Sequence, residues 1–364
     1  MTISFGIIGA GWRSEFFARI SHYLPEKFQL RGTVIRDKQK KKVWEKKWRT
    51  TGFTTIESMT NTTDLDFVIT AVPWAVNPNL IKELIDLGIP VLSETPPAPD
   101  IEALIDLYEY VRDHNGKVQV AEQYPLRPQH QAQLQFIKTG LLGEITFADV
   151  SIAHGYHGIS LLRRLLGIES ELGSIRSFQF NSPILQGADR TGFPSQRRMS
   201  NSRHNHFIFK FENDKYGIVD FTEDQYFGFI RNNRITIRGT TGEIHNNSIY
   251  WMKDHQNPRR STFQRLTLGT EGDINGNYLY EIQANGETYY SNPYHHPMMD
   301  EEIAVAEVLK RMGDFVTSDT PFYSLAEGCQ DHYLYLLGQE SIKKNQTVII
   351  DQMPWEDNFG AISS

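Results

Sequence analysis

The chain has 364 residues, of which 39% are hydrophobic and 22% are charged, a balance typical of folded globular proteins. Its net charge of −7 argues against a surface that binds nucleic-acid phosphates, because such surfaces usually carry a basic excess. The single cysteine, Cys329, excludes an intrachain disulfide and a cysteine-based metal site. A predicted strand begins close to Met1 and long apolar runs are absent, so we expect a cytoplasmic protein without membrane contact.

The first 122 residues alternate apolar strands with helices. The expected strands lie in residues 3–11, 28–37, 66–73, 89–94 and 117–122, and the expected helices in residues 14–24, 38–48, 77–88 and 101–116. Short apolar strands separated by helices are typical of a parallel sheet that helices cover on both faces. This pattern predicts an α/β domain over residues 1–122.

The pattern changes after residue 122. Helices are expected in residues 129–143, 158–167, 301–316 and 325–345, and strands in residues 144–153, 175–180, 206–213, 216–224, 234–240 and 288–292. Polar and apolar residues alternate in most of these strands, which favours a large, open, mostly antiparallel sheet with one wet face. We therefore expect residues 123–364 to form an α+β domain. The polar stretch 192–205 is expected to be a long loop, either a cover over a cleft or a plain surface loop.

A glycine-rich turn directly follows the first strand. Its sequence is Gly9-Ala10-Gly11-Trp12-Arg13-Ser14, a G-x-G-x-x-G pattern in which serine replaces the third glycine. Between a strand and a helix this pattern is typical of dinucleotide binding, since backbone N–H groups at the helix N-terminus can hold a pyrophosphate. We expect Gly9 to form the tight turn, and Gly11, Trp12 and Arg13 to lie at the cofactor. The alternative is an ordinary glycine turn.

The second strand ends near Arg36 and Asp37, roughly 20 residues after the glycine turn, where Rossmann proteins read the adenosine ribose. An acidic residue at this point favours NAD, whereas an arginine favours the additional phosphate of NADP. Because Arg36 comes first, the sequence predicts NAD(P) with a slight preference for NADP.

Several segments together resemble the Gfo/Idh/MocA oxidoreductases, and the resemblance covers nearly the whole chain. They are "DFVITAVPWAVNPNLIKELIDLGIPVLSETPP", "GLLGEI", "HGYHGISLLRRLLG" and "ITIRGTTGEI", in the order that the family has them. The resemblance implies a Rossmann domain followed by an α+β domain, and hydride transfer between NAD(P) and a carbinol carbon of a sugar or polyol. It also implies a homodimer or homotetramer formed through the C-terminal sheet.

The chain departs from the family pattern at two places. The family's Glu-Lys-Pro corner is Glu94-Thr95-Pro96 here, and the hydroxyl of Thr95 does not ionise near neutral pH as an acid–base group must. Two alternatives to a dehydrogenase stay open, the first because the family also contains such enzymes and the second because of the departures. One is an enzyme that retains its cofactor and cleaves glycosides or epimerises sugars through a transient keto sugar. The other is a dinucleotide-binding sensor without catalysis.

The second departure lies in the family pattern Asp-x-Gly-x-His-x-x-Asp. Its positions are Ala153, Gly155, His157 and Ser160 in this chain, so only the glycine and the histidine remain. His157 is therefore the leading candidate for the general acid–base, with an ionisation expected near the imidazole value of ~6.5. The next candidates are His154 and Tyr156.

Four further residues match positions that line the family's cofactor cleft. They are Pro73, Glu94, Thr95 and Gln123, and an ordinary contact between the two domains is the alternative for Gln123. Histidines and carboxylates elsewhere in the chain show no spacing that requires three ligands to converge, so no metal is expected.

Overall fold

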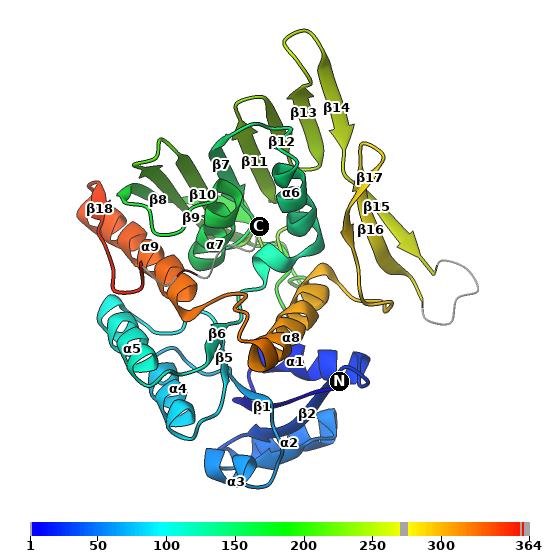
Figure 1. The fold of residues 1–364 in the computed structure, drawn as a ribbon, viewed down its shortest axis with the longest axis vertical. Helices are drawn as coiled ribbons and strands as arrows, with labels where there is room; N and C mark the ends of the chain where they lie inside the picture. Colours follow the sequence, from blue (N-terminus) through cyan, green and yellow to red (C-terminus); the bar gives the residue numbers. More distant parts are fainter. Residues whose placement is uncertain (1, 270–275, 357–358, 360–364) are drawn as a thin grey trace.

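The computed structural model describes residues 2–269, 276–356 and 359 (Figure 1). Its first sheet has six parallel strands in the order β3-β2-β1-β4-β5-β6. The strands are β1 (Ile3–Ile8), β2 (Phe28–Val34), β3 (Thr51–Phe53), β4 (Phe67–Thr70), β5 (Val91–Ser93) and β6 (Val118–Val120). The helices between them are α1 (Trp12–Tyr23), α2 (Lys38–Trp48), α3 (Ile56–Thr60), α4 (Asn77–Asp86) and α5 (Ile101–Asp113). The predicted Rossmann-type domain is confirmed.

The order of the strands explains where a ligand can bind. The chain runs outward from β1 to β3, then returns to β4 on the other side of β1, so the connections diverge between β1 and β4. In open parallel sheets, ligands bind at the carboxyl ends of the strands at such a point. The glycine turn follows β1, and the Glu94-Thr95-Pro96 corner follows β5, so both lie along this edge.

The second sheet has nine strands in the order β14-β13-β12-β11-β7-β10-β9-β8-β18. All neighbouring pairs are antiparallel except β7 and β10, so the predicted mostly antiparallel sheet is confirmed. Its strands are β7 (Ile145–Ser151), β8 (Gly173–Leu185), β9 (Met199–Phe211), β10 (Tyr216–Thr222), β11 (Arg234–Gly239), β12 (Gly242–His245), β13 (Ser248–Met252), β14 (Pro258–Thr262) and β18 (Val348–Ile350). A smaller sheet contains β15 (Gln264–Leu268), β16 (Tyr278–Ala284) and β17 (Glu287–Ser291).

The prediction of a loop over residues 192–205 is wrong for residues 199–205, which belong to a strand. Strand β9 begins at Met199 and pairs with β8 residue by residue up to Leu185, which leaves residues 186–198 as the connection. The outer half of this hairpin is largely exposed, so its strands lack the apolar alternation by which a half-buried strand is recognised.

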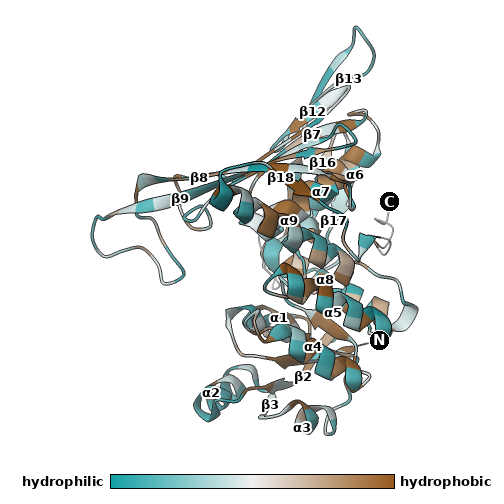
Figure 2. Ribbon diagram, turned by 90° about the vertical axis from the view of Figure 1, so that its left-hand side faces the viewer, coloured by the Kyte–Doolittle hydropathy of each residue, from teal (hydrophilic) through white to brown (hydrophobic). Residues whose placement is uncertain are grey.

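Helices cover one face of the large sheet (Figure 2). Helix α7 (Gly155–Leu166) packs on β7 and β10, and α9 (Leu325–Lys344) packs on β8 and β18. In the described part of the chain, Figure 2 shows no helix on the opposite face. The helix α6 (Pro128–Lys138) contacts β17, and the short 3-10 helix η1 (Tyr124–Leu126) leads into it.

One helix from the second half of the chain packs on the Rossmann sheet. Helix α8 (Asp300–Ser318) contacts α1, β1 and β4, and it also contacts η1. It therefore brings its first turn to the edge where the glycine turn and the end of β6 lie. The division at residue 122 that the sequence suggests stays a prediction.

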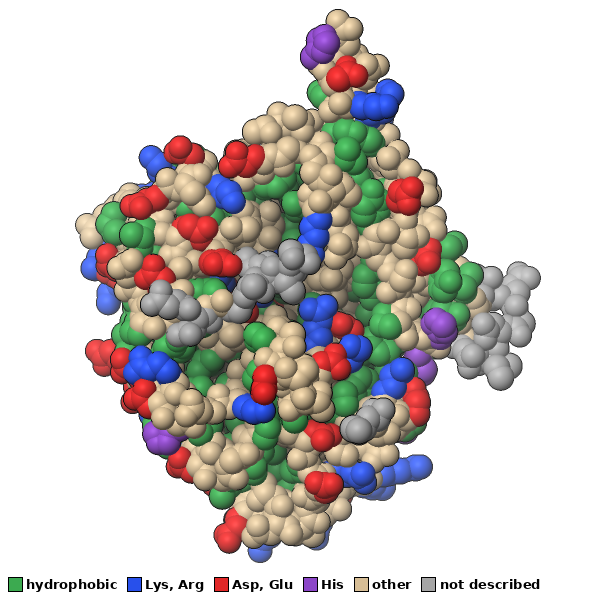
Figure 3. Space-filling view, in the orientation of Figure 1, with side chains coloured by type: hydrophobic (Ala, Val, Ile, Leu, Met, Phe, Trp, Pro, Cys, Tyr) green, Lys and Arg blue, Asp and Glu red, His purple; other side chains and the backbone are tan. Residues whose placement is uncertain are grey.

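The charged side chains on the face shown in Figure 3 are mixed rather than separated by sign. Within the described ranges, no helix has both the length and the apolar character needed to cross a membrane.

Candidate active site

A pocket of about 700 Å³ lies at the carboxyl edge of the Rossmann sheet. It is lined by residues that follow β1, β2 and β4, among them Gly9, Ala10, Gly11, Arg36, Asp37 and Pro73. Five of these residues are ones that the sequence assigns to the cofactor. The pocket therefore has the position and the lining that the adenosine half of a dinucleotide requires.

The two glycines of the turn have different structural roles. Gly9 has a φ of 111°, and a Cβ placed there would lie 2.2 Å from the carbonyl oxygen of Ala71, so only glycine fits. A Cβ placed on Gly11 would meet no atom within 4 Å and would point into open space. Ser14 is fully buried, which agrees with its place at the third, small position of the pattern. This arrangement fits a dinucleotide whose pyrophosphate approaches the backbone at Gly11.

Arg36 and Asp37 both line the pocket, but Asp37 already has a structural role. Its Oδ1 accepts hydrogen bonds from the backbone N–H groups of Gln39 at 2.8 Å and Lys40 at 3.0 Å, so it caps α2. The bonds from Lys40 and Gln39 lower the pKa of Asp37. Arg36 is exposed beside it. The pocket thus contains one carboxylate that already caps α2 and one exposed guanidinium group.

An ion-pair network joins the glycine turn to the end of β5 and to the first turn of α8. Nε of Arg13 lies 2.9 Å from Oε1 of Glu94, and its Nη1 lies 2.9 Å from Oε1 of Glu301 at the start of α8. Burial opposes the charge of Arg13, but the two carboxylates outweigh it and raise its pKa. The sequence predicts both Arg13 and Glu94 at the cofactor, but it does not predict their ion pair.

Glu301 also binds the segment that follows β6. It accepts hydrogen bonds from Nε2 of Gln123 at 2.9 Å and from Nε of Arg127 at 3.0 Å. Burial alone would raise the pKa of Glu301, but Arg127 and Arg13 lower it to about 2. Sequence reasoning missed Glu301, whose only signal is an acidic residue in the first turn of a helix.

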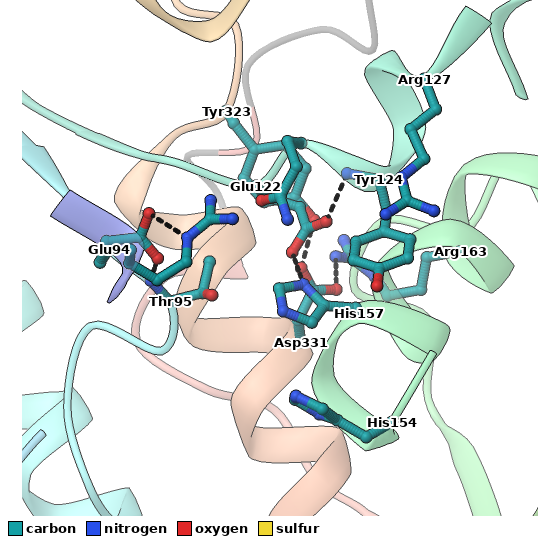
Figure 4. A network of polar contacts seen from close by, with 12 residues as sticks. Glu94, Thr95, Glu122, Tyr124, Arg127, His154, His157, Arg163, Tyr323 and Asp331 are labelled. Carbon is teal, nitrogen blue, oxygen red and sulfur yellow. Dashed lines mark hydrogen bonds and ion pairs between the residues drawn. The ribbon is translucent and has the colours of Figure 1, made fainter. Parts of the chain in front are cut away.

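The candidate general acid–base His157 pairs with a carboxylate that the sequence analysis also missed. Nδ1 of His157 lies 2.6 Å from Oε2 of Glu122, and the side chain of Glu122 is fully buried. The other carboxylate oxygen, Oε1, accepts the backbone N–H of Tyr124 at 2.9 Å. Figure 4 shows Glu122 and His157 pointing toward each other. In the sequence, Glu122 could have been found as an acidic residue directly after the apolar strand β6, since ligands bind at that edge of the sheet.

The ionisation expected for His157 near ~6.5 is wrong. Burial, with Arg13 nearby, lowers the pKa of His157 to about 3. Burial raises the pKa of Glu122 to about 8, although the N–H of Tyr124 acts in the opposite direction. Both shifts have burial as their main cause, and both favour the uncharged forms, a neutral imidazole and a protonated carboxyl.

Aromatic residues hold the His157 ring in place. The ring of Tyr124 stacks on it with centroids 4.6 Å apart. The hydroxyl of Tyr124 donates a hydrogen bond to that of Tyr226, which also accepts the backbone N–H of His154 at 3.1 Å. His154 is exposed as a residue, its ring lies 5.0 Å from that of His157, and its side chain does not cap α7. His154 thus lies beside His157 at the solvent side.

The remaining candidates differ in how far they are buried. Tyr156 is 3% exposed and its hydroxyl, among the described residues, has no hydrogen-bond partner. Burial raises the pKa of Tyr156 well above its usual value, which does not support a role in proton transfer. Thr95 is partly buried beside Glu94, and Pro73 is exposed at the pocket.

The connection between β8 and β9 reaches the glycine turn. Cζ of Arg190 lies 4.2 Å from the ring centroid of Trp12 and 5.7 Å from that of Phe227. One residue of the C-terminal part therefore contacts a residue that the sequence assigns to the cofactor. In the described ranges, no three His, Cys, Asp or Glu residues are arranged to hold a metal ion.

Comparison with known proteins agrees with the geometry of the first sheet. Residues 3–122 match the family model GFO_IDH_MocA, described as "Oxidoreductase family, NAD-binding Rossmann fold". No curated protein matches the chain.

Solved structures match over nearly the whole chain. An NAD-binding oxidoreductase from Klebsiella pneumoniae has a TM-score of 0.70 at 14% identity, covering 97% of this chain and 100% of its own. The scyllo-inositol dehydrogenase from Lactobacillus casei, with bound NAD(H) and scyllo-inositol, has a TM-score of 0.66 at 16% identity over 96% and 99%. An oxidoreductase from Agrobacterium radiobacter, in complex with NAD+, L-tartaric acid and magnesium, has a TM-score of 0.67 at 14% identity over 96% and 99%. At these identities the likeness establishes the fold.

Proposed function

We propose that the chain is an NAD(P)-dependent oxidoreductase of a sugar or polyol, because residues 3–122 match the family model of the NAD-binding Rossmann fold of the Gfo/Idh/MocA oxidoreductases. The observation that carries the proposal is the buried pair of Glu122 and His157, which lies just beyond the carboxyl end of β6. A dinucleotide site next to a proton-transfer pair is what carbinol oxidation or carbonyl reduction requires.

The residues of the pocket would hold the cofactor. Gly9 and Gly11 shape the turn that receives the pyrophosphate, and Arg36 lies where it could contact the adenosine ribose or its 2′-phosphate. When bound, the nicotinamide supplies the hydride chemistry. Glu94 and Thr95 would border it at the end of β5, and Gln123 would line the cleft through its contact with Glu301.

His157 would exchange the proton of the substrate hydroxyl through Nε2, because Nδ1 is engaged with Glu122. Tyr124 and Glu122 fix the ring from two directions, which keeps Nε2 in one orientation. His154, exposed beside His157, is placed to contact a substrate rather than to move the proton.

The substrate class is supported by the solved structures. The Lactobacillus casei protein binds scyllo-inositol, and the Agrobacterium radiobacter protein binds L-tartaric acid, both polyhydroxylated compounds. We propose a compound of this kind for the present chain, with NADP favoured over NAD only by the position of Arg36.

The open face of the large sheet supports a homodimer or homotetramer. Phe178 on β8, Ile208 on β9, Tyr216 on β10 and Tyr250 on β13 are exposed there. Light scattering should give an oligomer for the wild type and a monomer for Ile208→Asp, because the charge would be buried in the interface.

The proposal is tested by turnover of a panel of inositols, aldoses and hydroxy acids with NAD and NADP. His157→Ala should lower kcat by ~10²–10⁴ and leave dinucleotide affinity nearly unchanged. Thr95→Ala, which removes no titratable group, should cost much less. Dinucleotide binding without turnover across the panel would favour the sensor, and a tightly retained dinucleotide with substrate cleavage or epimerisation would favour the cofactor-retaining enzyme.

A further inference from the structure

We infer that Glu122 and His157 form a two-residue proton relay, in which the proton of the substrate oxygen moves through the imidazole to the buried carboxylate. The inference rests on the proposed function and extends it, because it assigns to Glu122 the group that stores and supplies the proton of the site.

The geometry restricts the proton to one path. Oε1 of Glu122 accepts the N–H of Tyr124, so the acidic proton lies on Oε2, which is 2.6 Å from Nδ1 of His157. No described residue hydrogen-bonds Nε2 of His157, and the side chain of His157 is 12% exposed. The carboxyl group is therefore sealed from solvent and reaches the cleft through the imidazole.

The surrounding charges favour an uncharged pair. Arg13 and Arg127 are matched by Glu94 and Glu301 through their ion pairs, so an ionised Glu122 would add a buried negative charge without a free cation. The groups that act electrostatically on the pair are Arg13 on α1, Glu94 after β5, Arg127 before α6, His154 and Tyr156 at the start of α7, Glu301 on α8, Tyr226 after β10, Tyr323 before α9 and Asp331 on α9. Asp331 is itself paired with Arg163. Burial accordingly keeps the proton on Glu122 at neutral pH, with a pKa of about 8.

Protons and electrons balance when the relay runs in either direction. In reduction, Nε2 of His157 gives its proton to the carbonyl oxygen while a hydride, with its electron pair, reaches the carbonyl carbon from the reduced dinucleotide of the proposed function. Oε2 of Glu122 gives its proton to Nδ1, which leaves a carboxylate and a neutral imidazole of the other tautomer. In oxidation, Nε2 takes the hydroxyl proton and Nδ1 returns its own to Glu122. The imidazole changes tautomer and never accumulates a positive charge.

This cycle makes opposite predictions for the two directions. Reduction consumes the protonated form of Glu122, so its rate should fall as the pH rises through about 8. Oxidation consumes the carboxylate, so its rate should rise over the same range. An imidazole acting without Glu122 would give no inflection near 8, because burial lowers the pKa of His157 far below that value.

The substitution Glu122→Gln separates the relay from simple positioning. The N–H of Tyr124 needs an acceptor, so the amide oxygen would replace Oε1 and the amide NH2 would face Nδ1. This arrangement holds His157 in place with its proton on Nε2 but cannot pass a second proton. The matched control is Glu302→Gln, because Glu302 is also a buried glutamate; it pairs with Arg19 and does not contact His157.

The decisive measurement needs no substrate. In the full chain labelled with 15N-histidine, the His157 signals, assigned by their loss in His157→Gln, should change from the Nε2–H to the Nδ1–H tautomer as the pH rises through about 8. In Glu122→Gln they should stay in the Nε2–H form, and in Glu302→Gln they should change as in the wild type. A His157 that takes up a second proton near ~6.5, or whose tautomer does not depend on Glu122, would overturn the relay.

Enzyme activity provides a second test of the relay. With a substrate from the panel, Glu122→Gln should lower kcat by ~10²-fold, retain KM and dinucleotide affinity, and lose the inflection near pH 8, whereas Glu122→Asp should keep an inflection. Unchanged kcat and pH profile in Glu122→Gln would contradict the inference. A wild-type protein that binds no dinucleotide in calorimetry would defeat the proposed function, while the NMR titration would still decide the state of the pair.

Discussion

Nε of Arg13 lies 2.9 Å from Oε1 of Glu94, so a residue of the first turn of α1 is tied to the end of β5 across the ligand edge of the Rossmann sheet. Glu301 of α8 binds the same guanidinium, which brings the C-terminal half of the chain into the contact. The three side chains are largely buried, and Nη2 of Arg13 is a buried atom without a partner among the described residues.

Removing this guanidinium should destabilise the fold. Arg13→Ala leaves two carboxylates with less compensation, and breaking a buried pair typically costs ~3–5 kcal/mol. We expect the free energy of unfolding in urea to fall by about that amount. The control is Arg112→Ala, whose pair with Asp113 is 48% and 60% exposed and should contribute little. Equal losses for the two variants would show that the Arg13 network does not stabilise the fold.

Gly11→Val should separate cofactor binding from folding. Its φ of −84° suits any residue and a Cβ there meets no atom within 4 Å, so the variant should fold with nearly the wild-type melting temperature. The new side chain would occupy the space of the pyrophosphate, and calorimetry should show dinucleotide affinity reduced by ~10-fold or more. Gly9→Ala provides the contrast, because the clash with Ala71 should destabilise the fold itself. Wild-type affinity in a folded Gly11→Val protein would remove this assignment.

Arg36→Ala tests the choice of cofactor. If Arg36 contacts the 2′-phosphate, the variant should lose ~10-fold or more of its NADP affinity and little of its NAD affinity, since only one ligand loses a charge-assisted hydrogen bond. Titrations of the wild type and the variant with both cofactors give the ratio of NADP affinity to NAD affinity for each protein. Arg31→Ala, a change at another exposed arginine outside the pocket, is the control. Equal losses for NAD and NADP would mean that Arg36 does not read the phosphate.

Glu122 should also make stability depend on pH. Its pKa is about 8 in the folded chain, raised from 4.5, so its contribution to stability is complete below pH 4.5 and is lost as the pH rises through 8. The buried histidines have lowered pKa values, so they cost stability only as the pH falls below 6.5. Between pH 6.5 and 8, the free energy of unfolding of the wild type should therefore fall by ~1–2 kcal/mol relative to Glu122→Gln. Urea denaturation at several pH values measures this difference, and parallel curves for the two proteins would contradict the raised pKa.

The local sequence determined much of the fold. Helix α2 spans Lys38–Trp48 as predicted, because Asp37 supplies an N-cap and the lysines suit an exposed face. Strand β4 is fully buried and was recognisable as a continuous apolar run. The glycine turn was recognisable because its function requires particular residues at a fixed spacing after a strand. In each case the physical cause acts within a few neighbouring residues.

Only the tertiary structure decided which side chains form the site. Glu122 and His157 are 35 residues apart in the chain, and Arg13 and Glu301 are 288 apart, so no local pattern pairs them. Their contacts depend on how α7 packs against η1, which follows the last Rossmann strand, and on how α8 packs against the Rossmann sheet. The same packing buries His157 and Glu122 and thereby changes which of them holds the proton, because desolvation depends on the surrounding protein and not on the neighbouring sequence.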